Sequence, residues 1–240
     1  LTNDCGDPAT STAATLTVNK ASVTATAGSY VGTYDGASHA PSACAVTGGF
    51  IGNLTCTNDP ASVGPDLGSG DVEPLLVLNG ETEANFTVTS ENGSWEITPA
   101  LVTATAGSYN GTYDGAVHSP SPCLVTGGYI GDLICTNDPA SVGPDVGSGD
   151  VKPVLVLNGE TEANFNVTPG KGSWEITSAE VTMTAGDYSD VYDGVSHSPS
   201  DCAVTGDYTG DLSCTNDPAS VGPDVGSGDV KPVLVLNGET

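Results

Sequence analysis

Arginine is absent from this chain of 240 residues, and its basic side chains amount to four lysines against 30 aspartates and glutamates. The resulting formal net charge of −26 repels nucleic-acid phosphates, which proteins bind through clustered lysine and arginine. It also repels anionic lipid headgroups and favours solubility and the binding of cations. The composition therefore excludes a nucleic-acid-binding function and leaves cations as the ions that such a surface attracts.

Long apolar runs are also missing, since no stretch approaches the roughly 20 apolar residues of a membrane-spanning helix. We therefore expect no membrane insertion in this segment. No window shows the helical period of about 3.6 residues, and glycine and proline are spread throughout. The chain opens at Leu1 without an initiator methionine or a signal peptide, so we expect an internal piece of a longer polypeptide.

Most of the chain is one unit that recurs with a step of 79 residues. "ASVTATAGSYVGTYDG" at Ala21 becomes "ALVTATAGSYNGTYDG" at Ala100 and "AEVTMTAGDYSDVYDG" at Ala179, and "GSWEIT" closes the first two copies. A unit that is duplicated whole is expected to fold as a module. The expected segments are a leading stretch at 1–20, full repeats at 21–99 and 100–178, and an incomplete third repeat at 179–240.

Short alternating runs fill each repeat. "ASVTATAG" and "SWEIT" alternate β-branched or aromatic residues with small or polar ones, as half-buried strands do. "VKPVLVL" is typical of a buried strand, and the "NG" after it is the strongest two-residue hairpin signal. Six or so short strands in each repeat predict an all-β fold, a tandem array of small β-sandwich domains.

Six of the seven cysteines fall in three pairs with one spacing. Between the first pair lies "AVTGGFIGNLT", which is typical of a strand, a turn and a second strand, so a hairpin would bring the two thiols together. Zinc fits poorly, because its structural sites need four ligands and usually closer cysteine pairs. Disulfides persist in oxidising compartments and therefore predict an extracellular or cell-surface protein. The expected pairs are Cys44–Cys56, Cys123–Cys135 and Cys202–Cys214.

Four motifs in order give a family resemblance: "VTATAGSYVGTYDG", "AVTGGFIGNL", "SVGPDLGSGDVEPLLVL" and "EANFTVTSENGSWEITPA". Together they resemble the MBG repeat, a mostly-β, Ig-like module of bacterial extracellular adhesin-like proteins. The resemblance implies tandem Ig-like modules and no catalytic residues. "LTNDCGDPATSTAATLTVNK" at 1–20 resembles the last strands of a bacterial Ig-like domain, with a partner for Cys5 upstream; a free thiol or an intermolecular bridge is the alternative.

"DVGSGD" and its variant "DLGSGD" place two carboxylates on a glycine-rich stretch in every repeat. Calcium takes six to eight oxygen ligands, and Asn58 and Asp59 just upstream could add to the set. The stretch is nevertheless expected to be a turn that needs glycine for its backbone angles and aspartate for local hydrogen bonds, with calcium ligation as the alternative. The candidate calcium ligands are Asp66, Asp71, Asp145, Asp150, Asp224 and Asp229.

Other polar and aromatic residues have structural explanations. Each histidine follows the Asp of "YDG" by four residues and is expected to be a half-exposed strand residue, although a pH sensor or a metal ligand is the alternative. Asp35, His39 and Ser42 crowd together in sequence, which alone makes no catalytic triad. Trp95 and Trp174 are expected to pack in a core, with sugar stacking as the alternative. Five N-glycosylation sequons begin at Asn53, Asn85, Asn92, Asn110 and Asn166.

Two functional classes remain. The first is a non-catalytic structural region of a large secreted or cell-surface protein, in which tandem modules form a stiff stalk or fibre and contact neighbouring repeats or copies of the chain. The second is a binding module for calcium or for cell-surface or matrix glycans. The incomplete third repeat is expected to mark a window cut from a longer repeat array. The alternative is a filament subunit whose missing strand comes from a neighbouring chain.

Overall fold

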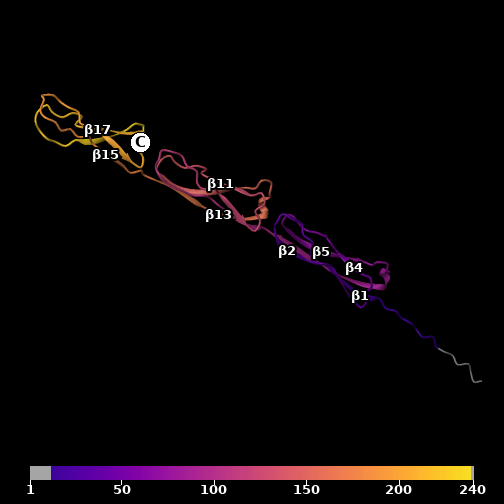
Figure 1. Cartoon of the computed structure of the whole chain (residues 1–240). Coiled ribbons are helices and arrows are strands. Elements are labelled where there is room, and N and C mark those ends of the chain that lie inside the picture. The colour runs from indigo at the N-terminus through magenta and orange to yellow at the C-terminus, as the bar shows by residue number, and fades with distance from the viewer. Residues whose placement is uncertain (1–11, 239–240) are drawn as a thin grey trace, which may run out of the picture. The chain divides into compact units, whose positions relative to one another are not determined.

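The computed structural model describes residues 12–238, and strands dominate them (Figure 1). The helical elements in that range are two three-residue 3₁₀ turns, so no helix there is long and apolar enough to cross a membrane. The chain divides into two compact units. The first holds the described residues up to Ala100 together with Ala163–Phe165, and the second holds the others.

The first repeat forms two sheets. A three-stranded sheet has the order β3-β1-β6, in which β1 runs antiparallel to β3 and parallel to β6. A four-stranded sheet has the order β2-β7-β5-β4, in which β7 runs parallel to β2 and antiparallel to β5. The elements are β1 (Ala21–Thr26), β2 (Tyr30–Thr33), β3 (Ala45–Gly48), β4 (Thr55–Asp59), β5 (Gly68–Val77), η1 (Glu83–Asn85), β6 (Phe86–Glu91) and β7 (Gly93–Thr98).

The core lies between these sheets because the strands alternate buried and exposed side chains. In β1, Val23 and Ala25 are buried while their neighbours are not. Val23 packs with Phe86 of β6 and Leu54, and Leu76 of β5 covers this cluster from the four-stranded sheet. Seven strands divided three and four around one core make a β-sandwich of the Ig-like class, which confirms the fold predicted from the sequence.

Two connections differ from local hairpins. Asn79 and Gly80 both have positive φ, and the Glu81 amide donates to the Leu78 carbonyl, so the predicted Asn-Gly turn forms. The strands on either side of it, β5 and β6, belong to different sheets. The strands after Cys44 and around Cys56, β3 and β4, are likewise in different sheets. The predicted disulfide therefore closes an arch from one sheet to the other.

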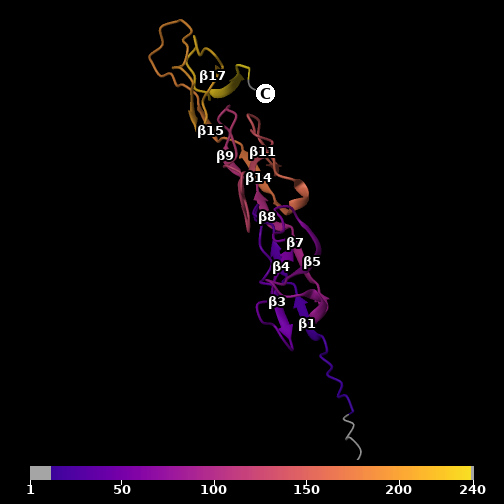
Figure 2. The same cartoon turned by 90° about the vertical axis from the view of Figure 1, so that its right-hand side faces the viewer.

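The second repeat has the same pairing as the first. Its sheets have the orders β10-β8-β13 and β11-β12-β14-β9, and β14 runs antiparallel to β12 and parallel to β9. Figure 2 labels four of these strands, β8, β9, β11 and β14. The elements are β8 (Ala100–Thr105), β9 (Tyr109–Thr112), β10 (Leu124–Gly127), β11 (Ile134–Asp138), β12 (Gly147–Val156), η2 (Glu162–Asn164), β13 (Phe165–Gly170) and β14 (Gly172–Thr177).

The third repeat consists of two antiparallel pairs, β15 with β16 and β17 with β18. Residues 188–191, which correspond to β9, and residues 226–230, which correspond to the first half of β12, form no strand. Both stretches run as loops in Figure 1. The elements are β15 (Val181–Thr184), β16 (Ala203–Gly206), β17 (Leu212–Asp217) and β18 (Lys231–Leu236).

The two compact units do not coincide with the three repeats predicted from the sequence. The first compact unit ends near the predicted start of the second repeat, whereas the second unit contains most of the second repeat and all of the third. Each predicted repeat contains two sheets of its own. That each repeat folds independently stays a prediction.

Candidate functional site

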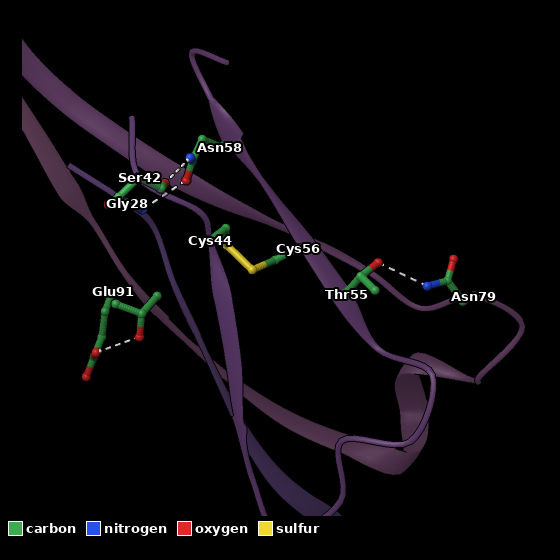
Figure 3. Close-up of a disulfide and its surroundings, with 9 residues drawn as sticks. Gly28, Ser42, Cys44, Thr55, Cys56, Asn58, Asn79 and Glu91 are labelled. Atoms are coloured by element: carbon green, nitrogen blue, oxygen red, sulfur yellow. Dashed lines mark hydrogen bonds between the residues drawn. A yellow bond between two sulfur atoms is a disulfide. The ribbon is translucent and has the colours of Figure 1, made fainter. Parts of the chain in front are cut away.

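A disulfide joins the two sheets in every repeat, at the positions that the sequence predicted. The Cα atoms of Cys44 and Cys56 are 5.6 Å apart, and those of the two later pairs are 5.5 and 5.7 Å apart. Figure 3 shows the first bridge beside Asn58 of β4. Cys5 lies outside the described residues, so its state stays a prediction.

An asparagine next to each disulfide holds the backbone around it. Nδ2 of Asn58 donates to the Ser42 carbonyl at 2.8 Å, and its Oδ1 accepts from the Gly28 amide at 2.9 Å (Figure 3). Asn137 and Asn216 make the same pair of bonds in the other repeats. Both ends of the Asn58 amide are therefore engaged by backbone groups. The sequence did not reveal these partners because they are distant from Asn58 in the chain.

The "YDG" motif builds a cluster of tyrosine, histidine and aspartate. The Asp35 carboxylate accepts from Nε2 of His39 at 3.0 Å and from the Ala37 amide at 2.9 Å. The His39 ring stacks on Tyr30 with centroids 4.6 Å apart. The hydrogen bond from His39, followed by that from Ala37, lowers the pKa of Asp35 below its ordinary value of 3.8. The cluster recurs at Asp114 and Asp193 with their own histidines.

This geometry separates the residues that crowd together in the sequence. Ser42 accepts a hydrogen bond from the Ser29 amide at its hydroxyl, whereas His39 engages Asp35 and Tyr30. The backbone of His39 forms a bridge with Val63, which joins two loops. The predicted half-exposed histidine is thus a loop-bridging residue, and Asp35, His39 and Ser42 are not arranged as a catalytic triad.

The expected calcium ligands lie in two different settings. The prediction of a turn over "DLGSGD" is wrong for its second half, because Gly68–Asp71 begin strand β5 and pair with β7. Asp66 precedes the strand and accepts from Nδ2 of Asn164 at 3.2 Å within the first compact unit. Asp150 accepts from Lys171 at 2.8 Å, which lowers the pKa of Asp150.

All six of these aspartates are exposed. Over residues 12–238 no group of three or more His, Cys, Asp and Glu side chains is arranged to hold a metal ion. Calcium binding therefore stays a prediction without a preformed site in the described part of the chain.

The five predicted glycosylation asparagines are exposed, as any modified residue must be. Asn92 is the single residue between β6 and β7. Asn110 lies in strand β9 opposite Glu175 of β14. Glycosylation itself stays a prediction.

Each tryptophan lies half-buried against a Gly-x-Gly pair, which explains the glycines of "GSG". A Cβ on Gly68 or Gly70 would come within 3.0 and 2.8 Å of the Trp95 ring. In the second repeat, Cβ atoms on Gly147 and Gly149 would come within 3.1 and 2.7 Å of Trp174. Residues i and i+2 of a strand face the same side, so the two glycines form one seat for the ring. This contact between glycine and tryptophan was not predicted from the sequence, although the Gly-x-Gly spacing shared by the repeats could have indicated it.

The same seat is empty in the third repeat. Nothing lies within 4 Å of a Cβ built on Gly226 or Gly228, which correspond to Gly147 and Gly149. An open cavity of about 860 Å³ runs here between residues 185–197 and residues 221–231. We call it the third-repeat groove. It occupies the place that β14 fills in the second repeat, between the stretches that correspond to β9 and β12.

The third-repeat groove is acidic. Burial and the nearby charges of Asp190 and Asp193 raise the pKa of Tyr188, in that order of effect. Two large apolar side chains in its wall, Val191 and Val225, are 84% and 86% exposed. Five aspartates line it against one lysine, namely Asp187, Asp190, Asp193, Asp224 and Asp229 against Lys231.

Comparisons with known proteins add little. No protein-family model and no curated protein matches this chain. Among solved structures, titin domains I67–I69 in an E-to-A variant match with a TM-score of 0.30 and 10% identity, over 88% of this chain and 86% of theirs. The titin I9–I11 tandem matches with a TM-score of 0.29 and 9% identity, over 92% of this chain and 88% of its own.

Sidekick-1 immunoglobulin domains 1–5 match with a TM-score of 0.27 and 12% identity, over 74% of this chain and 46% of theirs. At such TM-scores these likenesses carry no argument. The Ig-like sandwich follows from the chain's own sheets and disulfides, and the resemblance to MBG repeats stays a prediction.

Proposed function

We propose that this chain is a non-catalytic structural repeat region of a large secreted or cell-surface protein, of the adhesin kind that the MBG resemblance implies. The observation that supports the proposal is one small sandwich, closed by its own disulfide, that recurs along the chain. In each repeat the recurring polar residues hydrogen-bond to the backbone of neighbouring loops, as Asn58 and Asp35 do. Such modules provide length and stability.

Location outside the cell rests on the disulfides, because cytosolic thiols are normally kept reduced. The test is to trap thiols with an alkylating reagent in intact source cells and to analyse the protein without reduction. The proposal is supported if six cysteines escape alkylation because they are in disulfides, and if an antibody labels the protein on unpermeabilised cells. Alkylated thiols at Cys123 and Cys135 in freshly lysed cells would overturn it.

Stiffness rests on short connections. A single residue, Pro99, separates β7 from β8, and three residues separate β14 from β15. Within the second compact unit, the ring of Tyr208 packs edge-on against Tyr113 of the second repeat, with centroids 5.0 Å apart. Small-angle scattering tests this support: Tyr208→Ala is expected to broaden the distribution of dimensions, and Tyr192→Ala is the control because Tyr192 is 67% exposed.

A binding role for calcium or for glycans is the alternative. A calorimetric titration of the purified chain with calcium distinguishes the two classes. A purely structural region gives no saturable heat and no increase in melting temperature, because only a ligand that binds the folded state stabilises it. A saturable signal that Asp224→Asn together with Asp229→Asn removes would favour the binding module instead.

A further inference from the structure

The first two repeats each place an asparagine directly before a glycine in the turn that follows their longest strand. Asn79 and Asn158 have φ angles of 48° and 47°, and the glycine after each of them also has a positive φ. Both asparagines and both glycines are exposed. The local sequence is shared as well, because "VLNGETEANF" occupies residues 77–86 and again residues 156–165. The two turns therefore match in sequence and in backbone conformation.

An asparagine before a glycine can lose its side-chain amide without an enzyme. The main-chain nitrogen of the glycine attacks Cγ of the asparagine, a carbon–nitrogen bond forms, and the side-chain nitrogen leaves as ammonia with the proton of the attacking nitrogen. Water then adds to either carbonyl of the five-membered imide, which opens to aspartate or to isoaspartate. Glycine has no side chain to obstruct the attack. A Cβ built on Gly80 or on Gly159 meets nothing within 4 Å, so both nitrogens are open to this reaction.

The side-chain amide of the asparagine must turn toward the glycine nitrogen before it reacts, and hydrogen bonds oppose this movement. In the first repeat, Nδ2 of Asn79 donates to the Asn53 carbonyl at 2.7 Å. It also donates to the Thr55 hydroxyl at 3.0 Å (Figure 3). These bonds use both hydrogens of the amide nitrogen. The Asn79 amide is therefore held by two acceptors in β4 and the loop before it.

The second repeat has the first of these hydrogen bonds without the second. Nδ2 of Asn158 donates to the Asp132 carbonyl at 2.7 Å. The threonine of the first repeat is replaced here by Ile134, which has no hydroxyl and is 53% exposed. In the third repeat the same position is Ser213, whose hydroxyl accepts from Asn237 at 2.9 Å. Among the turns in residues 12–238, the second repeat is thus the exception.

We propose that Asn158 is a site of spontaneous deamidation, and that it reacts faster than Asn79 because Ile134 offers no hydroxyl to hold its amide. The loss of one hydrogen bond of ordinary strength corresponds to a rate that is about 2- to 10-fold higher. The inference goes beyond the proposed structural role and does not depend on it.

Deamidation changes this turn in two ways. A carboxylate has no hydrogen to donate, so the bond from position 158 to the Asp132 carbonyl is lost. A further negative charge then lies two residues from Glu160. Isoaspartate also adds one carbon to the main chain of a turn that connects β12 and β13, which belong to different sheets. The second repeat is therefore expected to lose stability as the protein ages, before the first repeat does.

The test follows both turns in the whole 240-residue chain during incubation at mildly alkaline pH. A protease that cleaves before aspartate releases them in separate peptides, residues 71–113 and 150–186, and fragmentation assigns each mass increase of one unit to its asparagine. An aspartate at position 158 adds a cleavage site, whereas isoaspartate does not. The folded chain is expected to react about 2- to 10-fold faster at Asn158 than at Asn79. In urea the two rates are expected to be equal, because the local sequences are identical.

Reciprocal variants exchange the hydroxyl between the repeats. Ile134→Thr is expected to slow Asn158 to the rate of Asn79, and Thr55→Ile is expected to raise the rate of Asn79. Both positions are exposed, so the fold is retained, and circular dichroism checks it. Thr136→Val is the matched control, because it alters the same exposed side of β11 and should leave both rates unchanged.

A further variant separates the hydroxyl from charge. Asp132→Asn removes the other difference beside this turn, since the first repeat has Asn53 there, and it is expected to leave the Asn158 rate unchanged. Equal rates at Asn79 and Asn158 in the folded chain overturn the proposal. An Asn158 that reacts in urea but not in the folded chain overturns it too, as does a rate that responds to Asp132→Asn and not to Ile134→Thr.

Discussion

The second and third repeats share most of their sequence but differ in structure where one strand is present or absent. In the second repeat β12 spans ten residues, Gly147–Val156, whereas its counterpart β18 spans six, Lys231–Leu236. The missing part corresponds to the residues of β12 that pair with β14. β9 is likewise a strand, while its counterpart at 188–191 is not.

The comparison teaches that these stretches have little tendency of their own to be strands. "GSGDV" contains two glycines and an aspartate, all disfavoured in strands, so only the hydrogen bonds of a neighbouring strand make it regular. The closing strand is thus the element that organises half of the four-stranded sheet. Each of the following predictions either weakens the second repeat, so that it should resemble the third, or compares the same change in both repeats.

The largest effect is expected from Ile176→Ala in the closing strand. Ile176 is 3% exposed, and truncating a buried isoleucine costs about 2–5 kcal/mol. Amide hydrogen exchange should show that β9 and residues 147–151 lose protection and approach residues 188–191 and 226–230. Val117→Ala is the control, because Val117 is 58% exposed. Unchanged protection of β9 would mean that β14 does not organise the sheet.

Removing a disulfide should cost the next largest amount. Cys123→Ser combined with Cys135→Ser opens a loop with a sequence separation of 12, which corresponds to roughly 3 kcal/mol in the chain-entropy picture. The same change at Cys202 and Cys214 should unfold the third repeat more completely, since it has fewer strands to retain it. Exchange measured repeat by repeat in urea compares the two. Equal residual protection in both double variants would contradict this expectation.

Adding one methyl group to the tryptophan seat sharpens the comparison. Gly149→Ala would place its Cβ 2.7 Å from Nε1 of Trp174, so the ring must move and stability should fall by about 1–3 kcal/mol. Gly228→Ala meets nothing within 4 Å and should leave the stability of the chain unchanged. Urea unfolding followed by circular dichroism reports both, because the third repeat contains no tryptophan. If the two variants lose the same free energy of unfolding, the Trp174 ring does not pack against Gly149.

The smallest effect concerns pH. The hydrogen bonds from His118 and Ala116 lower the pKa of Asp114 in the folded state below 3.8. This contribution is therefore complete above the ordinary pKa of 3.8 and is lost as pH falls through the folded-state value. Asp114→Asn should remove that part of the acid sensitivity, and Asp193→Asn should do the same in the third repeat. Unfolding curves at pH 5 and pH 3 measure it, with Asp132→Asn as the control.

Much of this architecture was accessible from the sequence. The alternating runs predicted an all-β fold, the equal spacing of the cysteines predicted the three bridges, and Asn79-Gly80 predicted a tight turn. These features depend on residues close together in the chain, where local conformation and short loops decide the outcome.

The features that sequence analysis missed depend on distant partners. Gly68–Asp71 was predicted to be a turn because its own composition favours one, but β7 pairs with it some 25 residues later. The strands beside Cys44 and Cys56 were predicted to form a hairpin, yet each pairs with a strand elsewhere, β1 or β5. Local propensity sets where a turn or strand is tolerated, and tertiary pairing sets which of the two is formed.

The parallel pairing of the first repeat has a mechanical consequence. β2, near its start, runs parallel to β7 at its end, from Tyr30 opposite Trp95 to Thr33 opposite Thr98. Tension applied to the two ends of the repeat would pull these strands in opposite directions along a common axis. Their hydrogen bonds are then loaded in shear and must rupture together. A sandwich with this parallel pairing resists extension better than one whose terminal strands separate by breaking one hydrogen bond at a time.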